Sequence, residues 1–289
     1  MEIQKESTLG YHWLDSLIKN KNKFMINNED TFKTNVLGLD EKIHGLVQGQ
    51  LYVLAARPAE GKTTLAINLI LRSLKNLKEN EIIIFISLEM SAKEILNRIL
   101  KILNNYEIGI SLQELMNTKK LLIIDYSHSN VSNIKKIIQE QQKTKIVKSV
   151  FIDHLQLLET SNINLPRYEK MTQITRELKI VARETNINIL AVSQLSRDVE
   201  KRTNKKESYE IQLSDLRDSG SIEQDADIVL FLYKPKTIKT KEGKSIQNKN
   251  QHIIQIGKNR NGSLGMIPTI FFKDKCLFTF LEDYKNEKK

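Results

Sequence analysis

Residues 53–66 read VLAARPAEGKTTLA, and this stretch decides how the rest of the chain is interpreted. The apolar run 51–55 predicts a buried strand, and Gly61, Lys62 and Thr63 open a segment rich in apolar residues that predicts a helix. A strand, a tight loop and a helix in this order are typical of a phosphate-binding loop, in which backbone N–H groups and the helix N-terminus face an anion.

The loop also carries the two side chains that such a site needs. Lys62 places an ammonium near the terminal phosphates, and the Thr63 hydroxyl can hold Mg²⁺. Ala56 stands where the full pattern has its first glycine. The alternative is an ordinary strand-to-helix turn, which does not require Lys and Thr directly after Gly61. The sequence therefore favours a nucleotide site.

Composition limits the classes of protein that the chain can belong to. Its 289 residues are enough for one large core, and 40% apolar with 28% charged residues is typical of a globular protein. The net charge of +10 indicates nucleic acid only weakly, because just 10 of the 45 basic residues are Arg and a genome rich in A and T would favour Lys. A single Cys276 excludes an internal disulfide and a cysteine metal cluster. Without a signal peptide or an apolar run of about 18 residues, we expect a cytoplasmic protein and no membrane contact.

Along the chain, apolar runs alternate with helical patterns. The runs are 51–55, 82–86, 121–125, 146–152 and 187–193, and the helical patterns after the first begin near Ser91, 129 and 168. This alternation predicts a mostly parallel sheet with helices on both faces. Ser91 with Glu94 forms a capping box. The last third differs: runs 227–233, 252–256, 266–272 and 277–281 have little helix between them and predict antiparallel strands at the edge, whereas 234–250 predicts a loop.

Polar side chains follow several of these strands. Glu89, Asp153 and Gln194 each come at the end of an apolar run. Because the carboxyl ends of parallel strands meet at one edge of the sheet, all three are expected beside Lys62 and Thr63. Asp153 would bind Mg²⁺, Glu89 would deprotonate the attacking water and Gln194 would sense the γ-phosphate. Taken singly, Asp153 could instead cap a helix and Glu89 could be a solvated charge; together, behind a phosphate loop, they predict nucleoside triphosphate hydrolysis.

Two later segments carry candidate phosphate-binding groups. Residues 217–221, RDSGS, form a short polar stretch suited to presenting a guanidinium and backbone N–H groups to a phosphate backbone, although such a loop can simply be solvated. Residues 257–262, GKNRNG, follow a strand. They form either a charged hairpin turn or an arginine finger that reaches ATP held by an adjacent subunit.

These motifs together resemble those of DnaB-type replicative helicases. The motifs, in order, are AARPAEGKTT at 55–64, SLEM at 87–90, IDHLQL at 152–157, SQL at 193–195, DLRDSGSIEQDAD at 215–227 and GKNRNG at 257–262. The resemblance covers about residues 34–273, and that family has alanine at the position of Ala56.

The resemblance implies an α/β fold, a RecA-like P-loop NTPase core with a mostly parallel sheet and antiparallel strands at its C-terminal edge. It implies an ATP- and Mg²⁺-dependent DNA helicase that forms a ring, a homo-oligomer expected to be a hexamer, and moves 5′ to 3′ on single-stranded DNA. Lys62, Glu89, Gln194, Arg260 and Lys258 become catalytic, and Thr63 and Asp153 hold Mg²⁺. The ATP-binding residues are Arg57, Pro58, Ala59, Glu60, Gly61, Lys62, Thr63 and Thr64, and the DNA-binding residues are Arg217, Asp218 and Gly220.

The resemblance also divides the chain. Residues 1–33 form an extension with a linker helix at about 9–20, residues 34–283 form the ATPase domain, and 284–289 form a basic tail. We expect the family's N-terminal helical domain to be missing; a primase or helicase loader remains a candidate partner. One alternative is a RecA-like ATP-dependent DNA-binding or assembly factor without unwinding activity. Another is a branch-migration ATPase of the RadA kind, against which the lack of a four-cysteine zinc module and the sequence 219–224 argue.

Overall fold

The computed structural model describes residues 31–280 except 107, 109, 161–163, 197–210, 217–218, 236–237, 240–244 and 247–249, together with the single positions 14 and 283. The expected linker helix at 9–20 therefore lies outside the described residues, apart from position 14, and so does the basic tail.

A nine-stranded sheet forms the centre of the molecule, in the order β15-β14-β13-β10-β3-β9-β7-β4-β5. Its strands are β3 (Leu51–Ala56), β4 (Glu81–Ser87), β5 (Leu121–Asp125), β7 (Ile146–Asp153), β9 (Asn188–Gln194), β10 (Ile228–Tyr233), β13 (Gln251–Asn259), β14 (Gly265–Phe272) and β15 (Leu277–Phe280). Six neighbouring strands, from β10 to β5, run parallel, and β13, β14 and β15 continue the sheet in antiparallel pairs. The α/β fold predicted from the alternating pattern is confirmed.

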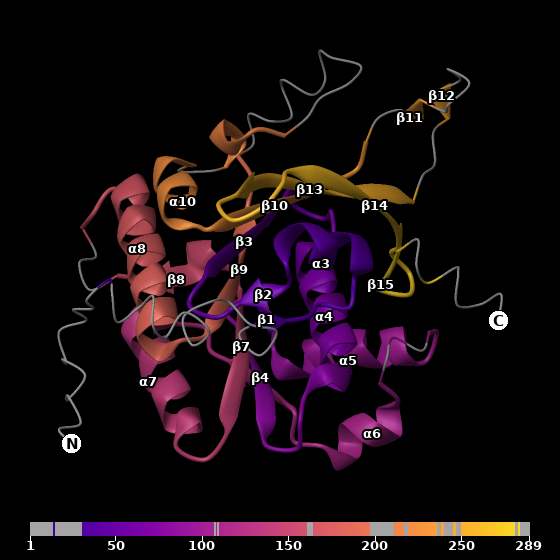
Figure 1. Ribbon diagram of the computed structural model, residues 1–289, viewed down its shortest axis with the longest axis horizontal. Helices are drawn as coiled ribbons and strands as arrows, with labels where there is room; N and C mark the ends of the chain where they lie inside the picture. Colours follow the sequence, from indigo (N-terminus) through magenta and orange to yellow (C-terminus); the bar gives the residue numbers. More distant parts are fainter. Residues whose placement is uncertain are drawn as a thin grey trace.

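Helices cover both faces of this sheet (Figure 1). The longer ones are α3 (Leu37–Ile43), α4 (Lys62–Ser73) and α5 (Ala92–Leu103) on one face, and α7 (Val131–Gln142), α8 (Arg167–Thr185) and α10 (Ser219–Asp225) on the other. Each face has its own apolar core, and β3 shows why: Tyr52 and Leu54 belong to one core, Val53 to the other, and all three are fully buried. A strand covered on both faces is apolar at every position, as 51–55 is.

The remaining elements are short. They are β1 (Thr31–Phe32), β2 (Leu46–Val47), η2 (Leu74–Asn76), α6 (Leu112–Asn117), β6 (Ser129–Asn130), η3 (Leu155–Leu157), β8 (Leu158–Glu159), η4 (Leu213–Asp215), β11 (Ile238–Lys239) and β12 (Ser245–Ile246). The capping box expected for Ser91 and Glu94 is present at the start of α5, where the serine hydroxyl accepts from the Glu94 N–H.

Two expectations for the last third need correction. The run 227–233 is expected to be antiparallel, but β10 pairs with β3 in parallel and only the strands after it reverse direction. The segment 234–250 is expected to be a loop, yet the short strands β11 and β12 pair within it. The first error has a physical cause: a buried strand has the same apolar pattern in either direction, so the direction is set by the chain that leads into it.

Candidate active site

The phosphate loop lies between β3 and α4, as the sequence predicts. Gly61 precedes the helix with φ of +90°, a conformation that favours glycine, and a Cβ there would lie 2.9 Å from the Phe271 ring. The helix start has no side-chain cap and no acidic residue in its first turn. Its N–H groups are therefore available to an anion, and the helix dipole favours negative charge at this point.

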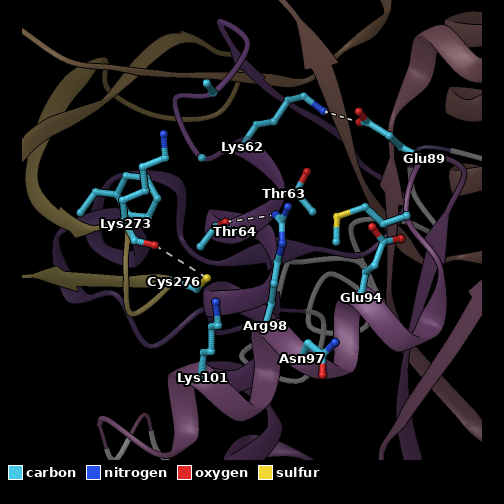
Figure 2. A pocket seen from close by; sticks show the side chains of 14 residues that line it. Lys62, Thr63, Thr64, Glu89, Glu94, Asn97, Arg98, Lys101, Lys273 and Cys276 are labelled. Atoms are coloured by element: carbon cyan, nitrogen blue, oxygen red, sulfur yellow. Dashed lines mark hydrogen bonds and ion pairs between the residues drawn. The ribbon is translucent and has the colours of Figure 1, made fainter.

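Lys62 brings the loop together with the ends of two other strands. Its Nζ atom lies 3.3 Å from Glu89 Oε2 and 3.3 Å from Asp153 Oδ1 (Figure 2 shows the first of these pairs). The lysine side chain is 12% exposed, that of Glu89 52% and that of Asp153 0%. The sequence prediction that these three side chains converge at one edge of the sheet agrees with this geometry.

Asp153 is the last residue of β7, not the cap of a helix, and its carboxylate has an unused acceptor. Its Oδ2 atom is buried and has no hydrogen-bond partner. A buried carboxylate oxygen without a partner is costly unless a cation or a donor binds there. Thr63, in the first turn of α4, is also buried. This donor set, a hydroxyl with an acidic oxygen, fits Mg²⁺.

His154 follows Asp153 through a cis peptide bond and faces the same cluster. Its Nδ1 atom lies 3.3 Å from Glu89 Oε2, and the residue is 7% exposed. Burial lowers the pKa of this imidazole, and the positive charge of Lys62 lowers it further, against the opposing effect of the carboxylates. The sequence prediction gives His154 no role; the signal for one is a histidine directly after a strand-end aspartate.

Gln194 ends β9 beside Ala56 of β3, at the same edge. Its backbone N–H donates to Gln156 Oε1 at 3.3 Å, and the Gln156 amide donates to Ser193 Oγ at 2.9 Å and to the Gln194 carbonyl at 3.3 Å. Gln156 therefore ties the end of β9 to the segment that follows Asp153. Its place in the motif 152–157 is visible in the sequence, but this task is not.

A pocket of about 620 Å³ extends from the phosphate loop along α5 (Figure 2). Arg98 points into it and donates from Nη1 to the Thr64 hydroxyl at 3.3 Å. The full lining is Ala59, Gly61, Lys62, Thr63, Thr64, Glu89, Met90, Glu94, Asn97, Arg98, Lys101, Phe271, Lys273 and Cys276. Of the predicted ATP-binding residues, 59 and 61–64 line this pocket, and 57, 58 and 60 lie in the same loop. Glu60 Oε2 lies 3.0 Å from His252 Nε2, within hydrogen-bond distance.

Lys258 and Arg260 lie at the other edge of the sheet. In the register of the strands, Ile228 is level with Tyr52 and with Asn259, whereas Leu232 is level with Ala56 and Ile254. Lys258 and Arg260 are thus beside the start of β3, about 13 Å along the strands from the phosphate loop. They are not brought to this chain's own pocket.

Lys258 and Arg260 both contact the end of α10. Lys258 Nζ donates to the carbonyls of Glu223 and of Ala226, the latter at 2.6 Å, and Arg260 donates to the carbonyl of Gln224. Arg260 Nη1 is also 3.7 Å from Asp227 Oδ1. Burial, and to a lesser extent the neighbouring Arg260, lowers the pKa of Lys258.

The predicted DNA-binding residues are only partly described. Arg217 and Asp218 lie outside the described residues, whereas Gly220 is exposed in the first turn of α10, with open space around the position that a Cβ would take. Among the described residues, no helix is long and apolar enough to cross a membrane.

Comparison with known proteins supports the resemblance that the sequence motifs indicate. A family model for the DnaB-like helicase C-terminal domain matches residues 31–280. The replicative DNA helicase DnaB of Mycoplasma pneumoniae is 36% identical over 272 residues, covering 86% of this chain and 57% of that protein. The DnaB of Geobacillus stearothermophilus is 35% identical over 282 residues, covering 89% of this chain and 59% of that protein. The chain thus spans little more than half the length of these relatives.

Two solved structures share the fold. One, described as an ATPase domain, superposes with a TM-score of 0.78 at 28% identity and covers 94% of this chain and 99% of that one. The other, described as a DnaB-like replicative helicase and its interactions with primase, gives a TM-score of 0.77 at 29% identity, covering 93% of this chain and 68% of that one.

Proposed function

The chain belongs to the family of DnaB-like helicase C-terminal domains, and on this premise we propose that it is an ATP-hydrolysing DNA helicase that translocates on single-stranded DNA during replication. One observation supports the proposal above the others. Lys62 of the phosphate loop lies 3.3 Å from both Glu89 and Asp153, so a cation, a candidate base and a candidate metal ligand share one site.

Each residue at this edge receives a proposed task. Residues 57–64 bind ATP, and Lys62 holds the terminal phosphates. Asp153 and Thr63 hold Mg²⁺, which when bound would neutralise charge on the phosphates. Glu89, half exposed beside the pocket, takes the proton of the attacking water. Gln194 reports the loss of the γ-phosphate to the segment after β9, and Gln156 holds its backbone in place.

The proposed catalytic set is completed by a second copy of the chain. Arg260 and Lys258 lie at the edge opposite the pocket, so they would reach a triphosphate only on a neighbouring subunit. We propose a closed ring, expected to be a hexamer. Head-to-tail contacts form either a ring or an open filament, and only in a ring does every pocket have a neighbour's Arg260 and Lys258 beside it. Family resemblance supplies the 5′ to 3′ direction.

The proposed DNA contact is made by residues 217, 218 and 220, at the start of α10. Sequence-independent contacts to phosphates weaken steeply as salt rises, so this binding is expected to be salt-sensitive. A primase or a loader is a further proposed partner, and activity on replicating DNA would place the protein in the cytoplasm. Residues 34–283 would form the motor domain, with 1–33 as a linker extension and 284–289 as a basic tail.

The test measures ATP hydrolysis with and without a single-stranded oligonucleotide at low salt, and then strand displacement on a forked duplex. We expect stimulation by DNA and unwinding in the wild type. Lys62→Ala and Glu89→Gln should each lose at least about 100-fold in hydrolysis, the size of effect seen when one transition-state group is removed. Lys75→Ala, an exposed lysine just beyond α4, is the matched control and should behave as wild type.

Two outcomes would redirect the proposal. ATP hydrolysis that DNA does not stimulate, together with no binding of DNA at low salt, would rule out a DNA motor. Hydrolysis that responds to DNA without strand displacement would instead support the RecA-like binding or assembly factor.

A further inference from the structure

Glu89, Asp153 and His154 form a compact cluster of metal-ligating groups. Each offers one ligand atom, and the three atoms lie within 4.8 Å of one another. Asp153 is fully buried, His154 is 7% exposed and Glu89 opens to the pocket. The cluster therefore combines two carboxylates and an imidazole at the end of a water-accessible cavity.

The spacing of the cluster fits a small divalent ion. Bonds of about 2.0–2.1 Å from Zn²⁺ to nitrogen and oxygen place tetrahedral ligands roughly 3.3–3.5 Å apart. His154 Nδ1 and Glu89 Oε2 are already 3.3 Å apart. With all three atoms inside 4.8 Å, only a small movement of the side chains brings Asp153 to the same separation.

Two buried polar atoms of the cluster lack hydrogen-bond partners. Asp153 Oδ2 and His154 Nδ1 are both buried, and neither makes a hydrogen bond. Buried polar atoms are usually satisfied, and a cation bound by Asp153 Oδ2 and by the unprotonated form of His154 Nδ1 would satisfy both at once. The ammonium of Lys62 lies against the other side of the cluster, 3.3 Å from Asp153 Oδ1, and does not reach either of these atoms with a hydrogen bond.

We propose that Glu89, Asp153 and His154 bind one divalent transition-metal ion of the Zn²⁺ type in the absence of nucleotide, with its fourth position open to the pocket. The imidazole is the reason for this choice, because nitrogen ligands favour zinc and its neighbours, whereas Mg²⁺ favours oxygen and water. The site shares Asp153 with the Mg²⁺ proposed above, but it uses His154 in place of Thr63 and the phosphates, so it forms only when nucleotide is absent. It requires neither ATP nor DNA, so it can fail or succeed independently of the helicase proposal.

The ammonium of Lys62 competes with the metal. It lies 3.3 Å from an oxygen of each carboxylate, and its charge repels a second cation at that distance. Removing this charge therefore tightens metal binding. Lys62 would thus have two opposite effects: it supports hydrolysis and weakens the metal site.

The experiment titrates the full, tag-free and nucleotide-free chain with Co²⁺, whose visible absorption becomes stronger when it leaves water for a four-coordinate site, and then displaces it with Zn²⁺. We expect one ion per chain and no displacement by a large excess of Mg²⁺. His154→Ala should weaken binding by at least about a hundredfold, more than the loss of an outer-shell partner costs. Lys62→Met should tighten it by about tenfold or more.

The chain provides a matched control. His128 lies 2.9 Å from Glu159, but both side chains are largely exposed, and no third ligand joins them among the described residues. His128→Ala should leave the titration unchanged. Glu89→Gln, at a half-exposed position, repeats the test if His154→Ala fails to fold. Binding that survives the loss of His154 or of Glu89, or that is lost with His128, would overturn the proposal.

Discussion

Cations lie at both ends of the parallel strands, but their surroundings differ. We call the end at which Lys62 lies the first edge and the opposite end, where Lys258 and Arg260 lie, the second edge. At the edge where the parallel strands end, Lys62 faces two carboxylates of its own chain at 3.3 Å, beside a phosphate loop and a pocket. At the opposite edge, Lys258 and Arg260 are held mainly by main-chain carbonyls at the end of α10. The first edge has the phosphate loop and the residues proposed to bind a triphosphate and its metal, and the second has cations without a phosphate loop.

This difference has a physical meaning. Hydrogen bonds from a cation to a phosphate are stronger than those to a neutral carbonyl, so Lys258 and Arg260 would gain by exchanging these carbonyls for a triphosphate. Their own chain offers none within reach, because β13 runs antiparallel to β10 and carries them away from the pocket. Under the proposed function, one chain would therefore provide two halves of a site, and each half would need another copy of the chain.

The largest effect is expected from removing the guanidinium of Arg260 at the second edge. Arg260→Ala should lower ATP hydrolysis by about 10³–10⁵, the contribution of an arginine finger to phosphoryl transfer, while leaving nucleotide affinity nearly unchanged. Hydrolysis rates and binding of a fluorescent ATP analogue measure the two quantities. Arg176→Ala, an exposed arginine on α8, is the matched control.

Mixing two inactive variants tests whether Arg260 acts on a neighbouring subunit. A mixture of Arg260→Ala with Lys62→Ala subunits should recover part of the activity, because some interfaces then combine an intact loop with an intact finger. Mixed assemblies that hydrolyse no faster than either variant alone would show that Arg260 does not act on a neighbour.

Asp227 anchors the second edge to the start of β3. It accepts from the Leu51 N–H at 2.8 Å and from Lys179 Nζ at 2.6 Å, and its carbonyl accepts from the Arg260 N–H at 3.1 Å. Asp227→Ala should lower the free energy of unfolding by about 2–4 kcal/mol, because it leaves a partly buried ammonium and a buried N–H without this partner. Urea unfolding measures the change.

Asp274→Ala, at an exposed aspartate between β14 and β15, is the control and should stay within about 0.5 kcal/mol of wild type. If the two variants are equally stable, Asp227 does not anchor this edge.

The comparison also shows what sequence can predict. The first edge was predictable, because apolar runs end in Glu89, Asp153 and Gln194, and parallel strands bring such ends together. The position of Lys258 and Arg260 relative to the pocket was not predicted, because it depends on which strands run antiparallel. Nothing in the apolar run 228–233 distinguishes its parallel pairing with β3 from an antiparallel one.

Contacts between distant segments escaped prediction for a related reason. The bonds of Gln156 to residues 193 and 194 and the approach of His154 to Glu89 depend on side-chain positions after packing. A glutamine or histidine within an apolar motif is visible in sequence, but its partner lies on another strand. The types of residue could therefore be recognised, and their pairings could not.

The smallest expected effect concerns the charge state at the second edge. Burial lowers the pKa of Lys258 in the folded chain below the ordinary lysine value of 10.5. Between that lowered pKa and 10.5 the unfolded chain binds more protons than the folded one, so stability contributed by this residue rises with pH across the window. The difference in unfolding free energy, wild type minus Lys258→Met, should therefore increase from about pH 8 to pH 10.

Urea unfolding at several pH values measures this difference, and Lys273→Met, at an exposed lysine of the pocket rim, is carried through the same series as the control. A difference that stays constant or shrinks would mean that the carbonyls of Glu223 and Ala226 fully replace the water that Lys258 loses. An increasing difference would show that they do not. Lys258 would then be a cation held at an energetic cost in the single chain, and a neighbour's triphosphate, with its full negative charge, would relieve that cost.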